Sequence, residues 1–165
     1  RGWRFMGRRK NDYSTIYAFC FSSIAPLQNL SSQTLKNPVK PKVIAIVGPT
    51  ASGKSALAMK LAKKFHGEVI SADSRQVYRG MDIGTGKITK KEMGGVPHHL
   101  LDIASPKTVF DVARYQRMAH KAIKDILKRG KLPIVCGGTG LYIKAIIETP
   151  VYPGTKPDWK LRAKL

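Results

Sequence analysis

The sequence has 165 residues, a length that suits one domain, and 42% of them are hydrophobic, which is enough for a sizeable core. No apolar run reaches the ~18 residues that a membrane span needs, so we expect no membrane partner. Two distant cysteines, Cys20 and Cys136, give no disulfide framework and no metal-ligand spacing, which favours a reducing compartment. The formal net charge is +20, and residues 41–165 carry 23 Lys/Arg against 9 Asp/Glu. Such a surplus favours a polyanionic partner, the alternative being a surface charged for solubility.

Residues 1–40 differ in composition from the rest of the chain. They contain seven basic residues, one acid and many Ser and Thr, and they show little hydrophobic periodicity. This composition is typical of a mitochondrial or plastid transit peptide, but it also fits a spurious upstream segment with the true start at Met6. We expect this leader to be disordered. We expect a cytoplasmic protein, or a mitochondrial or plastid one if the leader is a true transit peptide.

From residue 41 onward, strand and helix patterns alternate, and we interpret 41–150 as one α/β core. Val43–Val47 is a continuous apolar run, as expected for a strand buried on both faces. A helix follows from Lys54, and its apolar positions at helical spacing are Leu57, Leu61 and Phe65. Further elements are predicted at 68–72 (strand), 109–130 (helix), 132–137 (strand) and 141–148 (helix). This order predicts a parallel sheet with helices on both faces.

The helix predicted within 109–130 has the clearest amphipathic pattern in the chain, and Gly130 is expected to end it. Its apolar residues fall on one side, which we expect to face the core. They are Val112, Tyr115, Met118, Ala119, Ala122, Ile123 and Ile126.

A complete phosphate-binding motif of the form G-x-x-x-x-G-K-[ST] joins the first strand to the first helix. It consists of Gly48, Pro49, Thr50, Ala51, Ser52, Gly53, Lys54 and Ser55. The glycines allow consecutive N–H groups to point inward, and the start of the helix adds its positive dipole end. Lys54 supplies a mobile positive charge, and the Ser55 hydroxyl can coordinate Mg²⁺. The motif identifies a phosphate ligand, but it does not identify the reaction.

Candidate residues for the reaction follow the other two strands, because ligands of open parallel sheets bind beyond the carboxyl ends of the strands. Asp73 follows the second strand, where it could act as a general base, hold Mg²⁺ or cap a turn. Thr139 follows the third strand and offers a hydroxyl to an anion, the alternative being a glycine-rich turn before a helix. His98 and His99 are adjacent and would face opposite sides of a strand, so we expect a structural or RNA-facing role rather than a joint metal site.

Four motifs in this order and spacing resemble those of the tRNA dimethylallyltransferases, also called tRNA isopentenyltransferases or IPP transferases. They are "GPTASGKS", "ISADSRQVYRGMDIGTGK", "VPHHLLDI" and "GGTGLYIKAIIE". The resemblance covers about residues 41–165 and implies a P-loop NTPase-like fold. It also implies transfer of a dimethylallyl group from dimethylallyl diphosphate to N6 of the adenosine 3′-adjacent to the anticodon in tRNA, with release of diphosphate.

The resemblance also implies roles for individual residues. Asp73 would be the general base, with Lys54 and Thr139 as its catalytic partners. Residues 48–55 would bind the diphosphate, with Mg²⁺ at Ser55. The tRNA contacts implied are Asp73, Ser74, Arg75, Gln76, Thr139 and Arg162.

Some features depart from the family or leave alternatives open. We expect 151–165 to begin an inserted tRNA-binding helical region, and the C-terminal part of the family fold to be missing from this chain, which could leave the fragment inactive. The alternatives are an enzyme that prenylates free AMP, ADP or ATP, a small-metabolite P-loop kinase, and a non-catalytic RNA-binding remnant. No Arg-rich lid follows the third strand, which argues against the kinase. We expect a monomer.

Overall fold

The fold is a six-stranded sheet covered by helices on both faces. The computed structural model describes residues 4–5, 17–21, 43–148, 150 and 152. The strands are β1 (Arg4–Phe5), β2 (Tyr17–Phe21), β3 (Val43–Val47), β4 (Gly67–Ser71), β5 (His98–His99) and β6 (Leu132–Gly137). The helices are α1 (Lys54–Phe65), α2 (Lys90–Met93), α3 (Val112–Lys128) and α4 (Gly140–Ile147). The spatial order of the strands is β1-β2-β3-β6-β4-β5.

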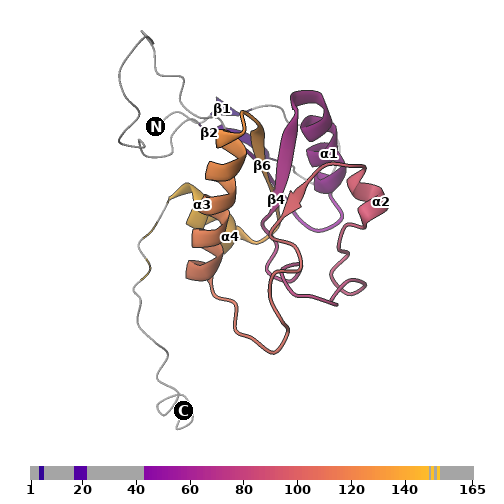
Figure 1. The fold of residues 1–165 in the computed structure, drawn as a ribbon, viewed down its shortest axis with the longest axis vertical. Coiled ribbons are helices and arrows are strands. Elements are labelled where there is room, and N and C mark those ends of the chain that lie inside the picture. The colour runs from indigo at the N-terminus through magenta and orange to yellow at the C-terminus, as the bar shows by residue number, and fades with distance from the viewer. Residues whose placement is uncertain (1–3, 6–16, 22–42, 149, 151, 153–165) are drawn as a thin grey trace.

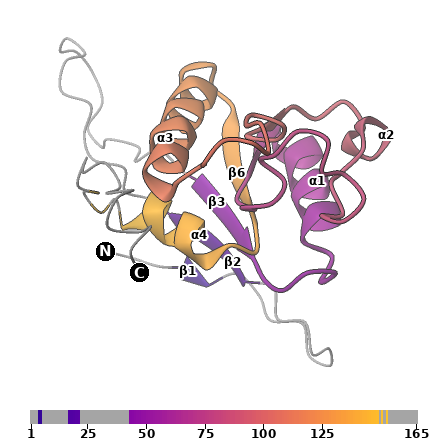
Figure 2. The same ribbon diagram turned by 90° about the horizontal axis from the view of Figure 1, so that it is seen from below.

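The predicted parallel sheet is confirmed for β3, β6, β4 and β5, which pair in parallel along the sheet. β6 lies between β3 and β4, so the last of the three main strands separates the first two. Figures 1 and 2 show α1 on one side of this sheet and α3 with α4 on the other. In the described residues, no helix is both long enough and apolar enough to cross a membrane.

Residues 1–40 contribute two short strands to the sheet, which the sequence analysis did not predict. β2 pairs antiparallel with β3 and β1 pairs antiparallel with β2. The expectation of disorder for 1–40 is therefore wrong for these two segments. The rest of this leader lies outside the described residues, as do most residues of the predicted segment 151–165.

Two hydrophobic clusters, one on each face of the sheet, hold the helices in place. On one face, α3 buries the side chains that its amphipathic pattern predicted, with Tyr115, Ala119, Ile123 and Ile126 fully covered. On the other face, the prediction for α1 was partly wrong. Ala58, Met59 and Ala62 are its buried residues, Leu57 and Leu61 pack at the margin, and Phe65 is 49% exposed near Lys64. The small side chains of α1 allow the helix to lie close to the sheet.

A buried carboxylate joins three elements at the end of the sheet where β4 begins. Glu68 is 1% exposed, and its carboxylate accepts hydrogen bonds from Arg129 at the end of α3 and from Lys131 before β6. His99 of β5 lies 2.7 Å from the same carboxylate through Nε2. The Arg129 hydrogen bonds, reinforced by Lys131 and His99 and opposed by burial, hold the pKa of Glu68 far below its usual range.

Replacing Glu68 with Gln is expected to lower the free energy of unfolding at pH 7 by about 1–3 kcal/mol, since it leaves Arg129 and Lys131 without their shared carboxylate. The folded-state pKa of Glu68 is depressed, so its contribution is present above the unfolded-state pKa of about 4.3 and is lost as pH falls below it. Denaturant unfolding of the wild type and of Glu68→Gln, at pH 7 and near pH 3, measures the difference in free energy of unfolding between them. An equal difference at the two pH values would contradict a stabilising contribution from the ionised Glu68 carboxylate.

Candidate functional site

The loop between β3 and α1 has the geometry of a phosphate-binding loop. Ala51 and Gly53 adopt left-handed backbone conformations, with φ of 61° and 81°, and Gly53 caps the start of α1. Within the described part of the chain, no group accepts a hydrogen bond from the N–H groups of residues 50–55. These N–H groups and the N-terminal end of α1 are therefore available to an anion, as the motif predicted.

Lys54, the first residue of α1, curls back over this loop. Its Nζ donates a hydrogen bond to the carbonyl oxygen of Pro49 and lies 3.4 Å from the Oγ of buried Ser52. The ammonium group is also close enough to Cys136 to act against the effect of burial, which raises the pKa of that thiol to about 11. Lys54 thus holds a positive charge over the loop, while Cys136 stays a neutral core side chain near pH 7.

Glycines bring the carboxyl ends of the three main strands into close contact. A Cβ on Gly137, at the end of β6, would lie 2.2 Å from the carbonyl oxygen of Ala72, and a Cβ on Gly138 would lie 3.3 Å from the carbonyl oxygen of Gly48. The N–H of Ala72 also donates a hydrogen bond to the carbonyl oxygen of Cys136 at 2.8 Å. The segments that follow β3, β6 and β4 therefore meet at one edge of the sheet, with the phosphate loop and Asp73 among them.

Asp73 caps a turn with one of its oxygens. Its Oδ1 accepts hydrogen bonds from the backbone N–H groups of Arg75 at 2.9 Å and Gln76 at 3.4 Å. The second oxygen, Oδ2, has no hydrogen-bond partner in the described residues, and the side chain is only partly buried. The capping role and a role as base are compatible, because the cap fixes the carboxylate and leaves one oxygen to take a proton.

Thr139 binds within the protein, where the sequence analysis expected a hydroxyl offered to an anion. Its Oγ1 accepts a hydrogen bond from the N–H of Ser74 at 2.9 Å and lies 3.3 Å from the Ser74 hydroxyl. Its own N–H donates to the carbonyl oxygen of Ala72 at 3.1 Å. Thr139 therefore links the segment after β6 to the turn that carries Asp73, and it positions that turn.

The other predicted contacts lie on or beside the same turn. Arg75 is exposed, whereas the Gln76 amide nitrogen donates to the carbonyl oxygens of Thr85 (3.2 Å) and Gly86 (3.4 Å). Gln76 thus holds the loop at 80–87, in which Ile83 is fully exposed. Arg162 lies outside the described residues.

Lys87, the last residue of the motif "ISADSRQVYRGMDIGTGK", holds this loop in place, and no role was predicted for it from the sequence. Its side chain is 5% exposed, and Nζ lies 2.7 Å from Asp82 and 2.5 Å from Asp102, with a further hydrogen bond to Tyr78 O at 2.8 Å. Burial opposes the charge, but the two carboxylates raise the pKa of Lys87 above its ordinary value. Lys87 therefore stays protonated and fixes the loop beside Arg75.

Two stacked tyrosines support the end of β4 from the α3 side. The rings of Tyr115 and Tyr142 are 3.7 Å apart and nearly parallel, and the Tyr115 hydroxyl donates to the carbonyl oxygen of Ser71 at 3.0 Å. Burial raises the pKa of Tyr142 to about 12, helped by Tyr78, Asp111 and Asp73, so it stays neutral. Sequence reasoning placed Tyr115 in the core but could not detect this pairing.

The donor set at the loop is compatible with Mg²⁺ held mainly by phosphates. The Ser55 hydroxyl, in the first turn of α1, makes no hydrogen bond to the described residues. Mg²⁺ commonly binds through one or two protein oxygens together with phosphates and water, and Ser55 fits that pattern. No group of three His, Cys, Asp or Glu side chains in the described residues could hold a metal by itself. His98 contacts the Val96 carbonyl oxygen at 2.9 Å and His99 contacts Glu68, so both rings are held by contacts within the protein.

The sheet order, the phosphate loop and the acidic residue at the next strand end define a P-loop NTPase-like protein, as the sequence predicted. The IPP transferase family model matches residues 76–165, more than half of the chain, and the chain belongs to that family. The match begins beyond the phosphate loop, so the family assignment and the loop geometry rest on different residues.

Curated relatives and solved structures agree with this family. The chain is 63% identical over 124 residues to the tRNA dimethylallyltransferase of Thermoanaerobacter sp., covering 75% of this chain and 39% of the relative. It is 52% identical to the tRNA dimethylallyltransferase of Streptomyces coelicolor, over 78% of this chain and 40% of the relative. The chain thus spans about two fifths of the length of these relatives.

Two solved structures have the same core. The tRNA isopentenylpyrophosphate transferase of Bacillus halodurans superposes with a TM-score of 0.66 at 53% identity, covering 73% of this chain and 40% of that one. A eukaryotic dimethylallyltransferase acting on tRNA superposes with a TM-score of 0.63 at 38% identity, covering 69% and 29%.

Gly137→Ala is expected to destabilise the protein by about 3 kcal/mol or more, or to push apart the ends of β4 and β6, because the new Cβ would overlap Ala72. Gly140→Ala is the matched control, since nothing lies within 4 Å of a Cβ there and alanine favours the helix it begins. Denaturant unfolding of both variants measures the difference. Similar stabilities would show that the close contact at Gly137 is not a constraint.

Proposed function

We propose that the protein transfers a dimethylallyl group from dimethylallyl diphosphate to N6 of the adenosine 3′-adjacent to the anticodon in tRNA. The observation that carries this proposal is the phosphate loop next to the Asp73 carboxylate. In the part of the chain that the structure describes, the loop N–H groups have no acceptor and one oxygen of Asp73 has no partner. The names of the relatives, tRNA dimethylallyltransferase, support this reaction over prenylation of free AMP or phosphorylation by a kinase. The basic surplus of residues 41–165 is consistent with a tRNA substrate.

The loop would act on the leaving group. When the allylic C–O bond breaks, its electron pair stays with the diphosphate, and the N–H groups of residues 50–55 and Lys54 would stabilise the growing negative charge. Ser55 would hold Mg²⁺, which when bound would neutralise part of the diphosphate charge. Positive groups fixed in advance make this leaving group easier to release.

Asp73 would act on the acceptor. As the new C–N bond forms, the adenine amine must lose one proton, and the free Oδ2 of Asp73 would take it. The backbone N–H groups of Arg75 and Gln76 hold Oδ1, and Thr139 holds the turn through Ser74, so the base has a fixed orientation. Ser74 and Arg75 lie on the same turn and would contact the acceptor nucleotide.

Asp73→Asn is expected to lower the single-turnover rate by about 10²–10⁴, because the amide keeps the cap but cannot take a proton. Donor affinity should change little. Asp111→Asn is the matched control, since Asp111 also caps backbone N–H groups, at the start of α3. Quenched assays with tRNA, at varied Mg²⁺, compare the three proteins. A wild-type rate in Asp73→Asn would rule out its role as base, and a shifted Mg²⁺ dependence with weaker donor binding would indicate a metal ligand.

Lys54→Ala is expected to weaken binding of dimethylallyl diphosphate by about 10- to 100-fold, the loss typical of a hydrogen bond to a charged group. Lys60→Ala, on an exposed position of the same helix, is the control and should bind as the wild type does. Calorimetric titration measures both. Equal affinities for the two variants would exclude Lys54 from the diphosphate site.

A further inference from the structure

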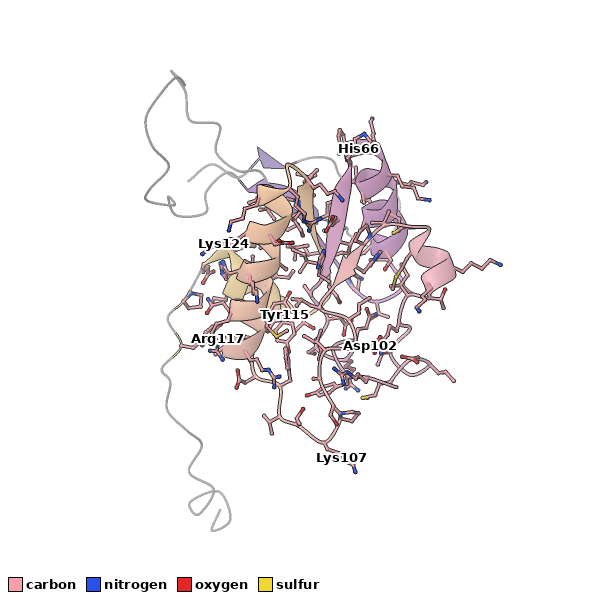
Figure 3. The ribbon with its side chains drawn as sticks, viewed as in Figure 1. His66, Asp102, Lys107, Tyr115, Arg117 and Lys124 are labelled. Carbon is pink, nitrogen blue, oxygen red and sulfur yellow. The ribbon has the colours of Figure 1, made fainter. Side chains whose placement is uncertain are left out.

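A row of four basic side chains runs along the face of α3 that points away from the sheet. Arg117, Lys121, Lys124 and Lys128 follow one another at spacings of four, three and four residues, which places them on one side of the helix. All four are exposed. Figure 3 shows Arg117 and Lys124 projecting to the same side of α3, whereas Tyr115 points toward the sheet. We call these four residues the α3 basic row.

The positive charge of the α3 basic row is not balanced by its neighbours. No carboxylate in the described part of the chain forms an ion pair with any of the four side chains. The one acid on this face, Asp125, pairs with Arg129 at 2.8 Å. His120 lies among them, and burial together with the charge of Lys124 lowers its pKa, so it is mainly neutral near pH 7.

An open pocket of about 540 Å³ lies along this row. Among the described residues, its lining comes from α3 alone: the α3 basic row together with Gln116, His120 and Asp125. A helix face that carries an amide, an imidazole and four cationic groups offers hydrogen-bond donors and positive charge to an anionic chain. From Arg117 to Lys128 the helix rises by about 16 Å, which is several steps of a nucleic acid backbone.

The α3 basic row begins near the catalytic edge of the sheet. α3 starts there, since Tyr115 in its first turn contacts the carbonyl oxygen of Ser71, the last residue of β4. The helix ends at the opposite edge, where Arg129 contacts Glu68 near the start of β4. The row therefore leads from the site of Asp73 along the outside of the molecule.

We propose that the α3 basic row binds the phosphate backbone of the tRNA substrate outside the nucleotide that is modified. This inference rests on the proposed function, because the acceptor must be a polynucleotide. The row would add affinity and orientation for tRNA and would take no part in the chemical step. It would act on any tRNA in the same way, since phosphate contacts carry no sequence information.

An anionic membrane is a less suitable partner for this face. A helix that lies on a membrane inserts apolar side chains between its basic ones, but the large apolar residues of α3 face the sheet, with Tyr115, Ile123 and Ile126 fully buried. The exposed large hydrophobic residues of the described chain are on other elements: Phe65, Met81, Ile83, Val109 and Leu141.

The test compares two triple variants of the whole protein. Arg117→Gln, Lys121→Gln and Lys124→Gln remove three charges from the α3 basic row. Lys60→Gln, Lys63→Gln and Lys64→Gln remove three charges from α1, on the opposite face of the sheet, and serve as the control. A tRNA transcript is titrated by fluorescence anisotropy from low to moderate salt, and donor affinity and single-turnover rate at saturating tRNA are measured in parallel.

The α3 variant is expected to bind tRNA about 10- to 100-fold more weakly at low salt and to lose about 2–3 units of the slope of log K against log salt, one for each lost phosphate contact. In the α1 variant, tRNA affinity and the salt slope should change less than in the α3 variant. Both variants should keep the donor affinity and the single-turnover rate of the wild type. Equal losses in the two variants would overturn the inference and leave the proposed function intact. A wild-type protein that binds no tRNA would overturn both the inference and the proposed function. The two outcomes differ, so failure of the proposed function can be told from failure of the inference about the α3 basic row. Binding of the wild type to vesicles of anionic phospholipid, lost only in the α3 variant while tRNA binding is unchanged, would overturn the inference in favour of a membrane.

Discussion

The contact between Gly137 and Ala72 is the constraint on which the candidate site depends. It lets the chain that leaves β4 lie directly against the end of β6, with no side chain between them. The phosphate loop follows β3 on the other side of β6, so the same contact sets how far Asp73 lies from that loop. Thr139 then fixes the orientation of the Asp73 turn through Ser74. A site assembled from backbone contacts between strand ends has little freedom to rearrange, which suits a reaction that depends on preorganised charge.

The charges of the protein are divided between two ends of the sheet with different tasks. At the edge that carries the candidate site, the N–H groups of residues 50–55 have no acceptor among the described residues, and Lys54 is held over the same loop by Pro49. At the opposite edge, Glu68 is surrounded by Arg129, Lys131 and His99 and joins β4, β5 and the α3–β6 connection. The buried Glu68 cluster thus supports the fold at the edge of the sheet opposite the candidate site.

The sequence was sufficient to predict the elements whose signals are local. The loop between the first strand and the first helix, that strand and the apolar side of α3 follow from residue type and spacing, and their geometry was confirmed, whereas phosphate binding by the loop stays a prediction. What the sequence did not reveal depends on pairing between distant residues. Thr139 and Ser74 are 65 positions apart, and nothing near Thr139 in sequence indicates that its hydroxyl binds within the protein. The two leader strands depend on pairing with the edge of β3, and Phe65 was misplaced because Ala58, Met59 and Ala62 are the buried side chains of α1.

The ion pairs of Lys87 have a consequence for which substitutions natural variants can tolerate. Two carboxylates, Asp82 and Asp102, share one buried ammonium group, so either acid could change and still leave Lys87 with a partner. A change at Lys87 is different, because it would leave the two acids facing a common space with no cation between them. The three positions are therefore unequal. A change at either acid leaves Lys87 one carboxylate partner, whereas a change at Lys87 removes the shared partner of both acids at once.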